Sequence, residues 1–307
     1  MLVSDFNYHL PEDLIAQKPL LDRSASRLLH VEKAPGELRD RYFREFPDLL
    51  RPDDLLVFNN TRVFPARLLG RRSGVRAQPL SAGNPASRGF LQGEVEVLLT
   101  RRRSADPNVW ECLVRPGRKI GVGETLLFGE GSELQAEVLE RGAFGERVVR
   151  FRAATDFFAV VERIGHVPLP PYVARSDDAS DRERYQTVYA KERGSVAAPT
   201  AGLHFTGEIL SRIRRRGIET AEITLQVGLG TFQPLRAERV EENKLHRETY
   251  SISPQAEAAI NRALETGKRV VAIGTTTVRA LEHSAASGGR VHPGSSEADL
   301  FIYPGYR

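Results

Sequence analysis

The sequence predicts an α/β protein that carries a small antiparallel β-barrel as an insertion. Residues 91–152 form a string of short alternating or apolar runs broken by glycines, a pattern typical of a small barrel. On both sides of this region, strand-like and helix-like segments alternate, which favours an α/β layer architecture. The composition changes character at the two borders. We therefore expect a discontinuous main domain over residues 1–68 and 153–307 and an inserted barrel-like domain over residues 69–152.

Five strands are expected in the insertion, at residues 94–100, 109–115, 125–128, 134–139 and 147–151. Residues 73–89 are rich in Gly, Ser, Pro and Ala and have no periodicity, so we expect a hairpin extension of the barrel without a function of its own. The single cysteine, Cys112, lies in an alternating run. We expect it to pack as a strand residue rather than to act as a nucleophile.

Helices and strands alternate in the main domain. Residues 155–164 show helical apolar spacing, and residues 206–216 begin with Thr206 as a plausible N-cap. A third helix opens at Ser253-Pro254, a cap followed by proline at the first helical position, and closes at Gly267. Strands are expected between these helices, at residues 55–58, 222–227 and 269–273.

Composition narrows the class of protein. The longest apolar runs fall far short of a membrane span and no leader-like segment opens the chain, so we expect a cytoplasmic protein. One cysteine excludes an internal disulfide, and none of the seven histidines pairs with another at metal-ligand spacing, so no metal is expected. The net charge is +4, and arginines cluster. Such clusters suit a phosphate-binding face but also occur on ordinary solvated faces. They are Arg101–Arg103, Arg115 with Arg118 and Lys119, and Arg212 with Arg214–Arg216.

Residues 269–281 (RVVAIGTTTVRAL) indicate a strand, a tight turn and a helix. Gly274 permits close backbone approach, and Thr275, Thr276 and Thr277 would place hydroxyls and free amides at the helix start. This arrangement suits an anionic or polar ligand at the sheet edge, although the lysine of a P-loop is absent. A capped helix start without a ligand explains the pattern equally well.

Two further segments follow predicted strands. Residues 56–68 run a strand into Asn59, Asn60, Thr61 and Arg62, which either form a simple turn or display an amide pair and a guanidinium at the sheet edge. Residues 227–232 (VGLGTF) begin like a dinucleotide fingerprint, but Gln233 stands at the third glycine position and the motif fails.

Histidines occur in two segments that suggest chemistry. Residues 244–250 (KLHRETY) place His246 and Glu248 two apart, so on a strand they would share a face and could orient a general base. An exposed polar strand edge is the simpler alternative. Residues 194–205 (GSVAAPTAGLHF) offer a serine, Thr200 and His204, but without a nucleophile elbow or an evident acid partner. Small residues in a row more often let a backbone pack against a flat ligand or another segment.

Taken together, the segments resemble one family, the S-adenosylmethionine:tRNA ribosyltransferase-isomerases of queuosine biosynthesis. The resemblance covers most of the chain outside residues 73–89 and lies in the order of many short motifs rather than in any one of them. The motifs are DFNYHLP (5–11), DRS (22–24) with Arg27-Leu28, LLVFNNTRVFPARL (55–68), GHVPLPPY (165–172), ERYQTVYA (183–190), GSVAAPTAGLHF (194–205), LQVGLGTFQPL (225–235), KLHRETYSI (244–252), AIGTTTVRALE (272–282) and LFIYPGY (300–306).

The resemblance implies an α/β/α sandwich-like main domain that carries an antiparallel semi-β-barrel. It implies two substrates, S-adenosylmethionine and a tRNA with a GUN anticodon that bears 7-aminomethyl-7-deazaguanine at the wobble position. The ribosyl group would be transferred and isomerised to give epoxyqueuosine in tRNA, with release of adenine and methionine. S-adenosylmethionine is then a co-substrate, and no metal or further cofactor is expected.

The implied chemistry needs groups that transfer protons, a surface that binds a sulfonium and a flat purine, and polar contacts to both substrates. Our candidates for proton transfer are His204, His246 and Glu248, and for stacking or cation–π contact Phe232, Tyr303 and Tyr306. The candidates for polar substrate contacts are Asn60, Thr61, Arg62, Thr200, Thr275, Thr276, Thr277 and Arg279.

Family members continue beyond the segment that resembles LFIYPGY with a stretch that completes the α/β domain, and this sequence ends at Arg307 without that stretch. Two alternatives therefore stay open. One is a truncated homologue that binds tRNA or S-adenosylmethionine without turnover. The other is a methyltransferase, although no glycine-rich fingerprint follows the first strand. We expect a monomer.

Overall fold

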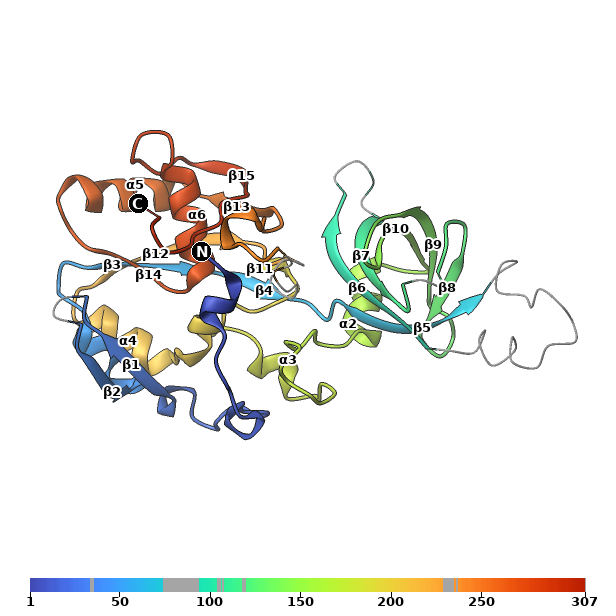
Figure 1. The fold of residues 1–307 in the computed structure, drawn as a ribbon, viewed down its shortest axis with the longest axis horizontal. Helices are drawn as coiled ribbons and strands as arrows, with labels where there is room; N and C mark the ends of the chain where they lie inside the picture. The colour runs from blue at the N-terminus through green and yellow to red at the C-terminus, as the bar shows by residue number, and fades with distance from the viewer. Residues whose placement is uncertain are drawn as a thin grey trace, which may run out of the picture. The chain divides into compact units, whose positions relative to one another are not determined.

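The protein is described by a computed structural model that covers residues 1–33, 36–73, 94–103, 106, 108–117, 120–228, 235 and 237–306. Two compact units emerge: Met1–Arg62 together with Pro170–Arg307, and Val63–Leu169. The second unit thus extends beyond the sequence-based borders at residues 69 and 152 on both sides. Figure 1 shows each unit with its own sheet structure.

The first unit is built on a mixed five-stranded sheet with the strand order β14-β3-β12-β13-β15. The strands β14 (Val270–Ala272), β3 (Leu55–Asn59) and β12 (Glu219–Leu225) run parallel. The strands β13 (Glu248–Ile252) and β15 (Gly294–Ala298) continue the sheet in antiparallel register. The parallel part matches three predicted strands to within a few residues.

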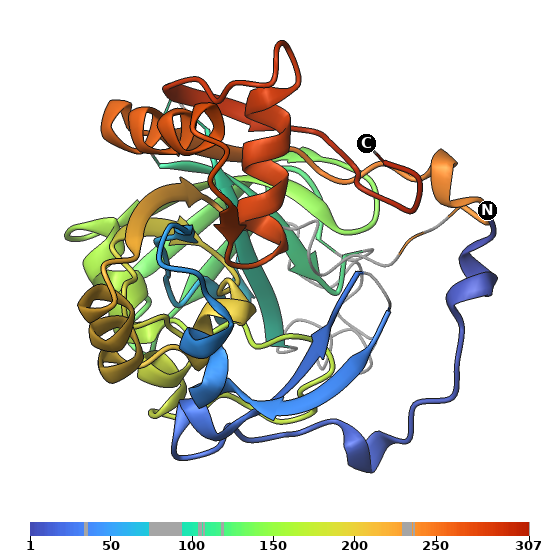
Figure 2. The same cartoon turned by 90° about the vertical axis from the view of Figure 1, so that its left-hand side faces the viewer.

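Helices cover both faces of this sheet. Because side chains alternate along β3, Leu55 and Val57 point into one core, which they share with Ile260 of α5 (Pro254–Glu265) and Ala280 of α6 (Thr275–Ala285). Leu56 and Phe58 point into the opposite core with residues of α4 (Gly207–Arg215) and the 3-10 helix η4 (Phe43–Leu49). Figure 2 shows these two layers of helices. The predicted α/β/α sandwich is therefore confirmed.

The start signals of the helices act as the sequence predicts. The Thr206 side chain accepts a hydrogen bond from the Ile209 amide, and the Ser253 side chain accepts one from the Ala256 amide. The first helix of the prediction, α2 (Phe157–Ile164), is capped by Asp156 and is part of the second unit.

Smaller elements complete the first unit. The hairpin of β1 (Arg27–Val31) and β2 (Leu38–Tyr42) and the short pair of β4 (Thr61–Val63) and β11 (Glu192–Ser195) were not predicted. The remaining helical turns are η1 (Val3–Phe6), η2 (Glu12–Leu14), η3 (Arg23–Ala25), α3 (Asp181–Arg184), η6 (Thr200–His204) and η8 (Val240–Glu242). Among the described helices, none has the length and apolarity needed to cross a membrane.

The second unit is a closed barrel in the strand order β10-β7-β6-β5-β8-β9, in which neighbours are antiparallel. The predicted inserted antiparallel barrel is confirmed, and its ring of strands is complete. Its strands are β5 (Arg67–Ser73), β6 (Glu94–Arg102), β7 (Val109–Arg115), β8 (Thr125–Phe128), β9 (Leu134–Arg141) and β10 (Glu146–Ala153).

Strand β5 completes the ring of strands and was not among the strands predicted from the sequence. Its run RLLGRRS contains a glycine and three arginines, which hide the alternation of a strand. Gly70 is required there because a Cβ atom would overlap the Leu127 carbonyl and the Phe128 ring of β8. The hairpin extension predicted over residues 73–89 lies outside the described residues, apart from its first residue.

Two features enlarge the second unit beyond its predicted borders. The α2 residue Phe157 stacks on Trp110 of β7, with ring centroids 5.5 Å apart. The two ends of the unit also meet, because Arg67 and His166 exchange backbone hydrogen bonds of 3.2 and 2.8 Å. Cys112 is buried as predicted, and burial raises the pKa of its thiol well above the usual range, which disfavours the nucleophilic thiolate.

Candidate active site

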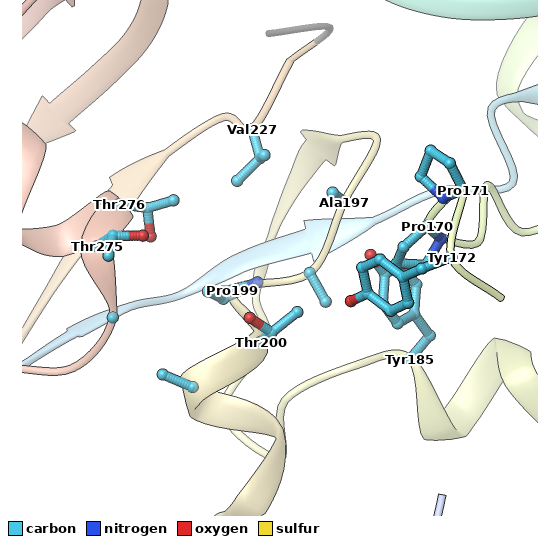
Figure 3. Close-up of a pocket in the computed structure, with 13 residues that line it drawn as sticks. Pro170, Pro171, Tyr172, Tyr185, Ala197, Pro199, Thr200, Val227, Thr275 and Thr276 are labelled. Carbon is cyan, nitrogen blue, oxygen red and sulfur yellow. The ribbon is translucent and has the colours of Figure 1, made fainter. Parts of the chain in front are cut away.

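A pocket of about 690 Å³ lies in the first unit, where the parallel strands end. The segments that follow β14, β3 and β12 all lie at this edge, the usual position for a ligand in an open α/β sheet. Figure 3 shows the side chains around it. Its described lining consists of Pro170, Pro171, Tyr172, Tyr185, Ala197, Ala198, Pro199, Thr200, Ala201, Val227, Gly274, Thr275 and Thr276.

One end of this larger pocket is aromatic. Tyr172 is 56% exposed, whereas Tyr185 is buried, and both contribute rings at the end remote from Thr275 and Thr276 (Figure 3). Burial raises the pKa of Tyr185, against a backbone hydrogen bond with Ala198 that lowers it, so this phenol stays neutral. Neutral rings of this kind suit a flat purine or a cationic group.

The other end of the larger pocket is polar. Gly274 has φ +90°, a conformation that favours glycine, and α6 begins immediately after it. No side chain caps this helix, so its first amides lie beside the exposed Thr275. Thr276 is held in place, since its hydroxyl accepts a 3.2 Å hydrogen bond from Asn59.

Asn59, one member of the amide pair at the end of β3, fixes this edge of the sheet. Its side chain donates to the Leu225 carbonyl at 3.0 Å and accepts from the Leu225 amide at 2.9 Å. It also accepts from the Thr61 amide at 3.2 Å. A fully buried asparagine that links β3, β12 and α6 holds the pocket edge rigid. The available signal was its position at the end of an apolar strand.

The floor of the larger pocket comes from the segment GSVAAPTAGLHF. Ala197 to Ala201 line it, in agreement with the expectation that small residues bring the backbone close to a ligand. Gly202, next in the chain, carries no Cβ because one would overlap the Tyr189 hydroxyl. Ser195 is buried, and its hydroxyl bonds to the Thr61 hydroxyl at 2.6 Å and to the Val227 amide at 2.8 Å.

A second pocket of about 320 Å³ adjoins the first, since Thr275 and Thr276 line both. Most of its walls are apolar, and its charged members are Glu248 and Arg279. Its described lining consists of Leu245, Glu248, Thr275, Thr276, Val278, Arg279, Leu300, Phe301 and Ile302.

Glu248 and Arg279 form a buried ion pair in this smaller pocket. Arg279 Nη1 lies 2.5 Å from Glu248 Oε2, and Glu248 Oε1 accepts the Gly228 amide at 3.1 Å. Arg279 also donates to the carbonyl oxygens of His246, Ala298 and Leu300, at 2.8, 3.0 and 2.9 Å. Its donors are thus directed to protein acceptors, and the arginine orders the pocket wall.

The two histidines do not join Glu248. Of the two alternatives for His246 and Glu248, a shared strand face and an exposed strand edge, neither describes His246, because β13 begins at Glu248 and His246 lies exposed in the preceding loop. His204 lies at the far end of η6 from Thr200, with its ring 5.3 Å from that of Phe43. Burial lowers the pKa of His204, but the residue lines neither pocket.

Three candidates for substrate contacts form hydrogen bonds within the fold. Thr277 is fully buried, and its hydroxyl donates to the Ile273 carbonyl at 2.8 Å. The Asn60 side chain bonds to Glu222 at 3.2 Å and to Thr224 at 2.7 Å. Thr61 is buried against Ser195 as described above. Arg62 differs from these three, because its side chain is exposed on β4.

The aromatic candidates lie apart from the larger pocket. Tyr303 packs against Phe301, with centroids 5.6 Å apart, and the Tyr306 hydroxyl donates to Glu282 at 3.3 Å. Neither is among the described residues that line the two pockets, whereas Phe301 lines the smaller one. Phe232 lies outside the described residues. The rings that do face the larger pocket, Tyr172 and Tyr185, belong to motifs of the resemblance to which no role had been given.

Acidic partners neutralise much of the arginine clustering. Arg101 pairs with Glu111 at 3.0 Å, Arg103 with Glu140 at 2.9 Å and Arg212 with Asp48 at 2.5 Å. Arg118 and Lys119 lie outside the described residues. Within the described ranges, no group of three or more His, Cys, Asp or Glu side chains is arranged to hold a metal ion.

The chain is similar to a known protein family over nearly its whole length. The family model described as "Queuosine biosynthesis protein" matches residues 3–307. An S-adenosylmethionine:tRNA ribosyltransferase-isomerase of Solibacter usitatus is 54% identical over 305 residues, which cover 99% of this chain and 84% of the relative. The enzyme of that name from Desulfitobacterium hafniense is 46% identical, with 100% and 84% covered. A crystal structure of S-adenosylmethionine tRNA ribosyltransferase from Thermotoga maritima is 31% identical, with 99% and 81% covered and a TM-score of 0.45.

Proposed function

Because the chain belongs to the queuosine biosynthesis protein family, we infer that it is an enzyme, an S-adenosylmethionine:tRNA ribosyltransferase-isomerase. Relatives that carry this name match nearly the whole chain at 45–54% identity. The enzyme accordingly takes S-adenosylmethionine and tRNA as its substrates.

The finer description of the reaction is also a proposal. The acceptor is 7-aminomethyl-7-deazaguanine at the wobble position of a tRNA with a GUN anticodon. A base removes a proton from the carbon beside the sulfonium, adenine leaves, and the aminomethyl nitrogen attacks the ribosyl group. Closure of the epoxide then expels methionine and leaves epoxyqueuosine in the tRNA. The reaction takes place in the cytoplasm, with the protein acting as a monomer.

The larger pocket is the observation that carries this proposal. Its volume of about 690 Å³ falls within the range of small-molecule sites. The rings of Tyr172 and Tyr185 offer faces to a purine or a sulfonium. The α6 start at Thr275 offers amides to a carboxylate. We propose that S-adenosylmethionine binds here, so that its flat, cationic and anionic parts all have a complementary surface.

The test is an incubation of the protein with S-adenosylmethionine labelled in the adenine and methyl groups and with tRNA that carries the precursor base. We expect free adenine, free methionine and a mass gain on the tRNA that equals the added ribosyl-derived group. Formation of S-adenosylhomocysteine would instead identify a methyltransferase. Binding of both substrates without any product would identify a non-catalytic homologue.

A further inference from the structure

Two adjoining pockets of different chemistry meet at Thr275 and Thr276. A transfer between two substrates requires both to be bound side by side. Each of the two pockets can therefore be assigned to one substrate. This assignment rests on the proposed function. The larger pocket has more than twice the volume of the smaller, about 690 against about 320 Å³, and an adenosyl group with an amino-acid chain needs the larger space.

The smaller pocket combines a flat apolar wall with a carboxylate. Phe301 and Leu300 contribute the apolar surface, and Glu248 contributes the charge. Nucleic-acid bases that leave a stack are commonly held between aromatic or apolar side chains and read along their hydrogen-bonding edge. A base of the guanine type presents N–H donors along that edge, and a carboxylate is an acceptor.

Glu248 has acceptor capacity left for such a base. A carboxylate has about four lone-pair sites. In Glu248 one site on Oε2 faces Arg279 and one on Oε1 faces the Gly228 amide. Among the described residues, these two partners hold the carboxylate in orientation and leave further lone pairs open. Glu248 is one of the residues that line the smaller pocket.

The same ion pair disfavours an anionic ligand. Arg279 directs its donors to Glu248 and to three backbone carbonyls, and it is the basic residue in the described lining of the smaller pocket. A phosphate or carboxylate would meet the negative charge of Glu248 without a free cation. A neutral ligand that donates hydrogen bonds fits better.

We propose that the smaller pocket receives the tRNA base, extruded from its stack, with Glu248 accepting hydrogen bonds from the guanine-type edge and Phe301 stacking on the ring. The sulfonium donor occupies the larger pocket, and the aminomethyl group meets the ribosyl carbon across Thr275 and Thr276. Arg279 is a positioning residue, because it acts on the base only through Glu248 and the carbonyls that it orders.

Two single substitutions separate the pockets. Phe301→Ala should weaken binding of precursor tRNA at least about fivefold, the effect of losing one base-stacking side chain, and leave the Kd of S-adenosylmethionine within about twofold. Tyr172→Ala should weaken S-adenosylmethionine binding and leave tRNA binding intact. Leu264→Ala removes an exposed apolar side chain from α5 and serves as the matched control, with both constants unchanged. Direct titrations measure both constants without turnover.

Glu248→Gln tests the reading of the base edge. The wild type should use tRNA whose precursor base lacks the 2-amino group at least about tenfold less efficiently in kcat/KM, and the variant should discriminate less. A thermal melt shows whether the variant is folded. If Phe301→Ala weakens S-adenosylmethionine binding and spares tRNA, or weakens neither, the assignment is overturned. If the wild type binds both substrates as expected but releases no adenine, the proposed function fails while the pocket assignment stands.

Discussion

Asp181 and Arg175 fasten the chain between Pro170 and Tyr185, which supplies one wall of the larger pocket. Arg175 binds the carboxylate with both of its terminal nitrogens, at 2.7 and 2.8 Å, and the Asp178 amide adds a third bond of 2.8 Å. The Asp181 side chain is only 4% exposed. Paired geometry of this kind, out of the solvent, is worth more than an ordinary surface ion pair.

This pair makes stability depend on pH. The hydrogen bonds from Arg175 lower the pKa of Asp181 below its ordinary value, against the opposing effect of burial. A lowered pKa in the folded state contributes stability that is fully present above the unfolded value near 3.8 and is lost as the pH falls through the folded value. Asp181→Asn should therefore lower the free energy of unfolding by about 3 kcal/mol at pH 7, and the deficit should shrink in acid.

Urea unfolding followed by circular dichroism at pH 7, 5 and 3 checks this expectation. Asp13→Asn, a change at an exposed aspartate of η2, is the matched control and should have almost no effect. A deficit for Asp181→Asn that stays constant down to pH 3 would contradict the proposed origin of the stability.

At the scale of elements, the arginines of α4 and of its C-terminal end fall into two groups, one that contacts η4 and one that is exposed. Arg212 donates to the Arg44 carbonyl at 3.2 Å and pairs with Asp48, while Arg216 donates to the Leu50 carbonyl at 3.0 Å and to Pro47. These two arginines attach α4 to η4. Arg214 and Arg215 are exposed on the helix, so they are the members of the predicted cluster that remain accessible to a phosphate backbone.

Charge reversal on this helix should weaken tRNA binding. Arg214→Glu with Arg215→Glu should lower the affinity about tenfold at low salt and reduce the slope of log K against log salt by about one to two. Arg214→Lys with Arg215→Lys keeps the charge and should keep both quantities. Filter binding at several salt concentrations measures them. An unchanged slope in the glutamate variant would exclude α4 as a phosphate contact.

Local signals explain which elements could be predicted. Thr206, Ser253 and Pro254 determine helix starts through contacts within one turn, so the sequence displays them directly. The strand β5 and the exposure of His246 depend instead on partners distant in the chain. The same holds for the site: Thr275 and Thr276 were found because they follow a strand, whereas Phe301 and Tyr185 reach the pockets only through tertiary folding. Buried candidates such as Thr277 cannot be told from free ones by residue type.

At the scale of the whole molecule, the barrel has the features of an independent folding unit. Its interior holds its own set of fully buried side chains, among them Val97, Leu126 and Val138. The unit also contains its own helix, α2, packed on Trp110. A closed ring of strands leaves no unpaired edge.

Residues 63–169 expressed alone should therefore fold. We expect a β-rich circular dichroism spectrum and a single cooperative thermal transition. Val97→Asp, which places a charge in the barrel interior, should abolish the transition and serves as the negative control. A broad, non-cooperative melt of the unsubstituted fragment would show that the barrel depends on the rest of the chain.

The backbone bonds between Arg67 and His166 have a consequence for the order of folding. The parallel pairing of Leu55 with Glu219 closes a very long loop of chain, and such closure costs conformational entropy that grows with the logarithm of loop length. Once the barrel has formed, its two ends are held together, so the part of the loop that is still unfolded is much shorter. Each halving of that length lowers the free-energy cost of closing the loop by about 0.6 kcal/mol. The folded barrel thus lowers the entropy cost of pairing β3 with β12. Insertions or deletions within the barrel, far from Arg67 and His166, should therefore leave this cost almost unchanged.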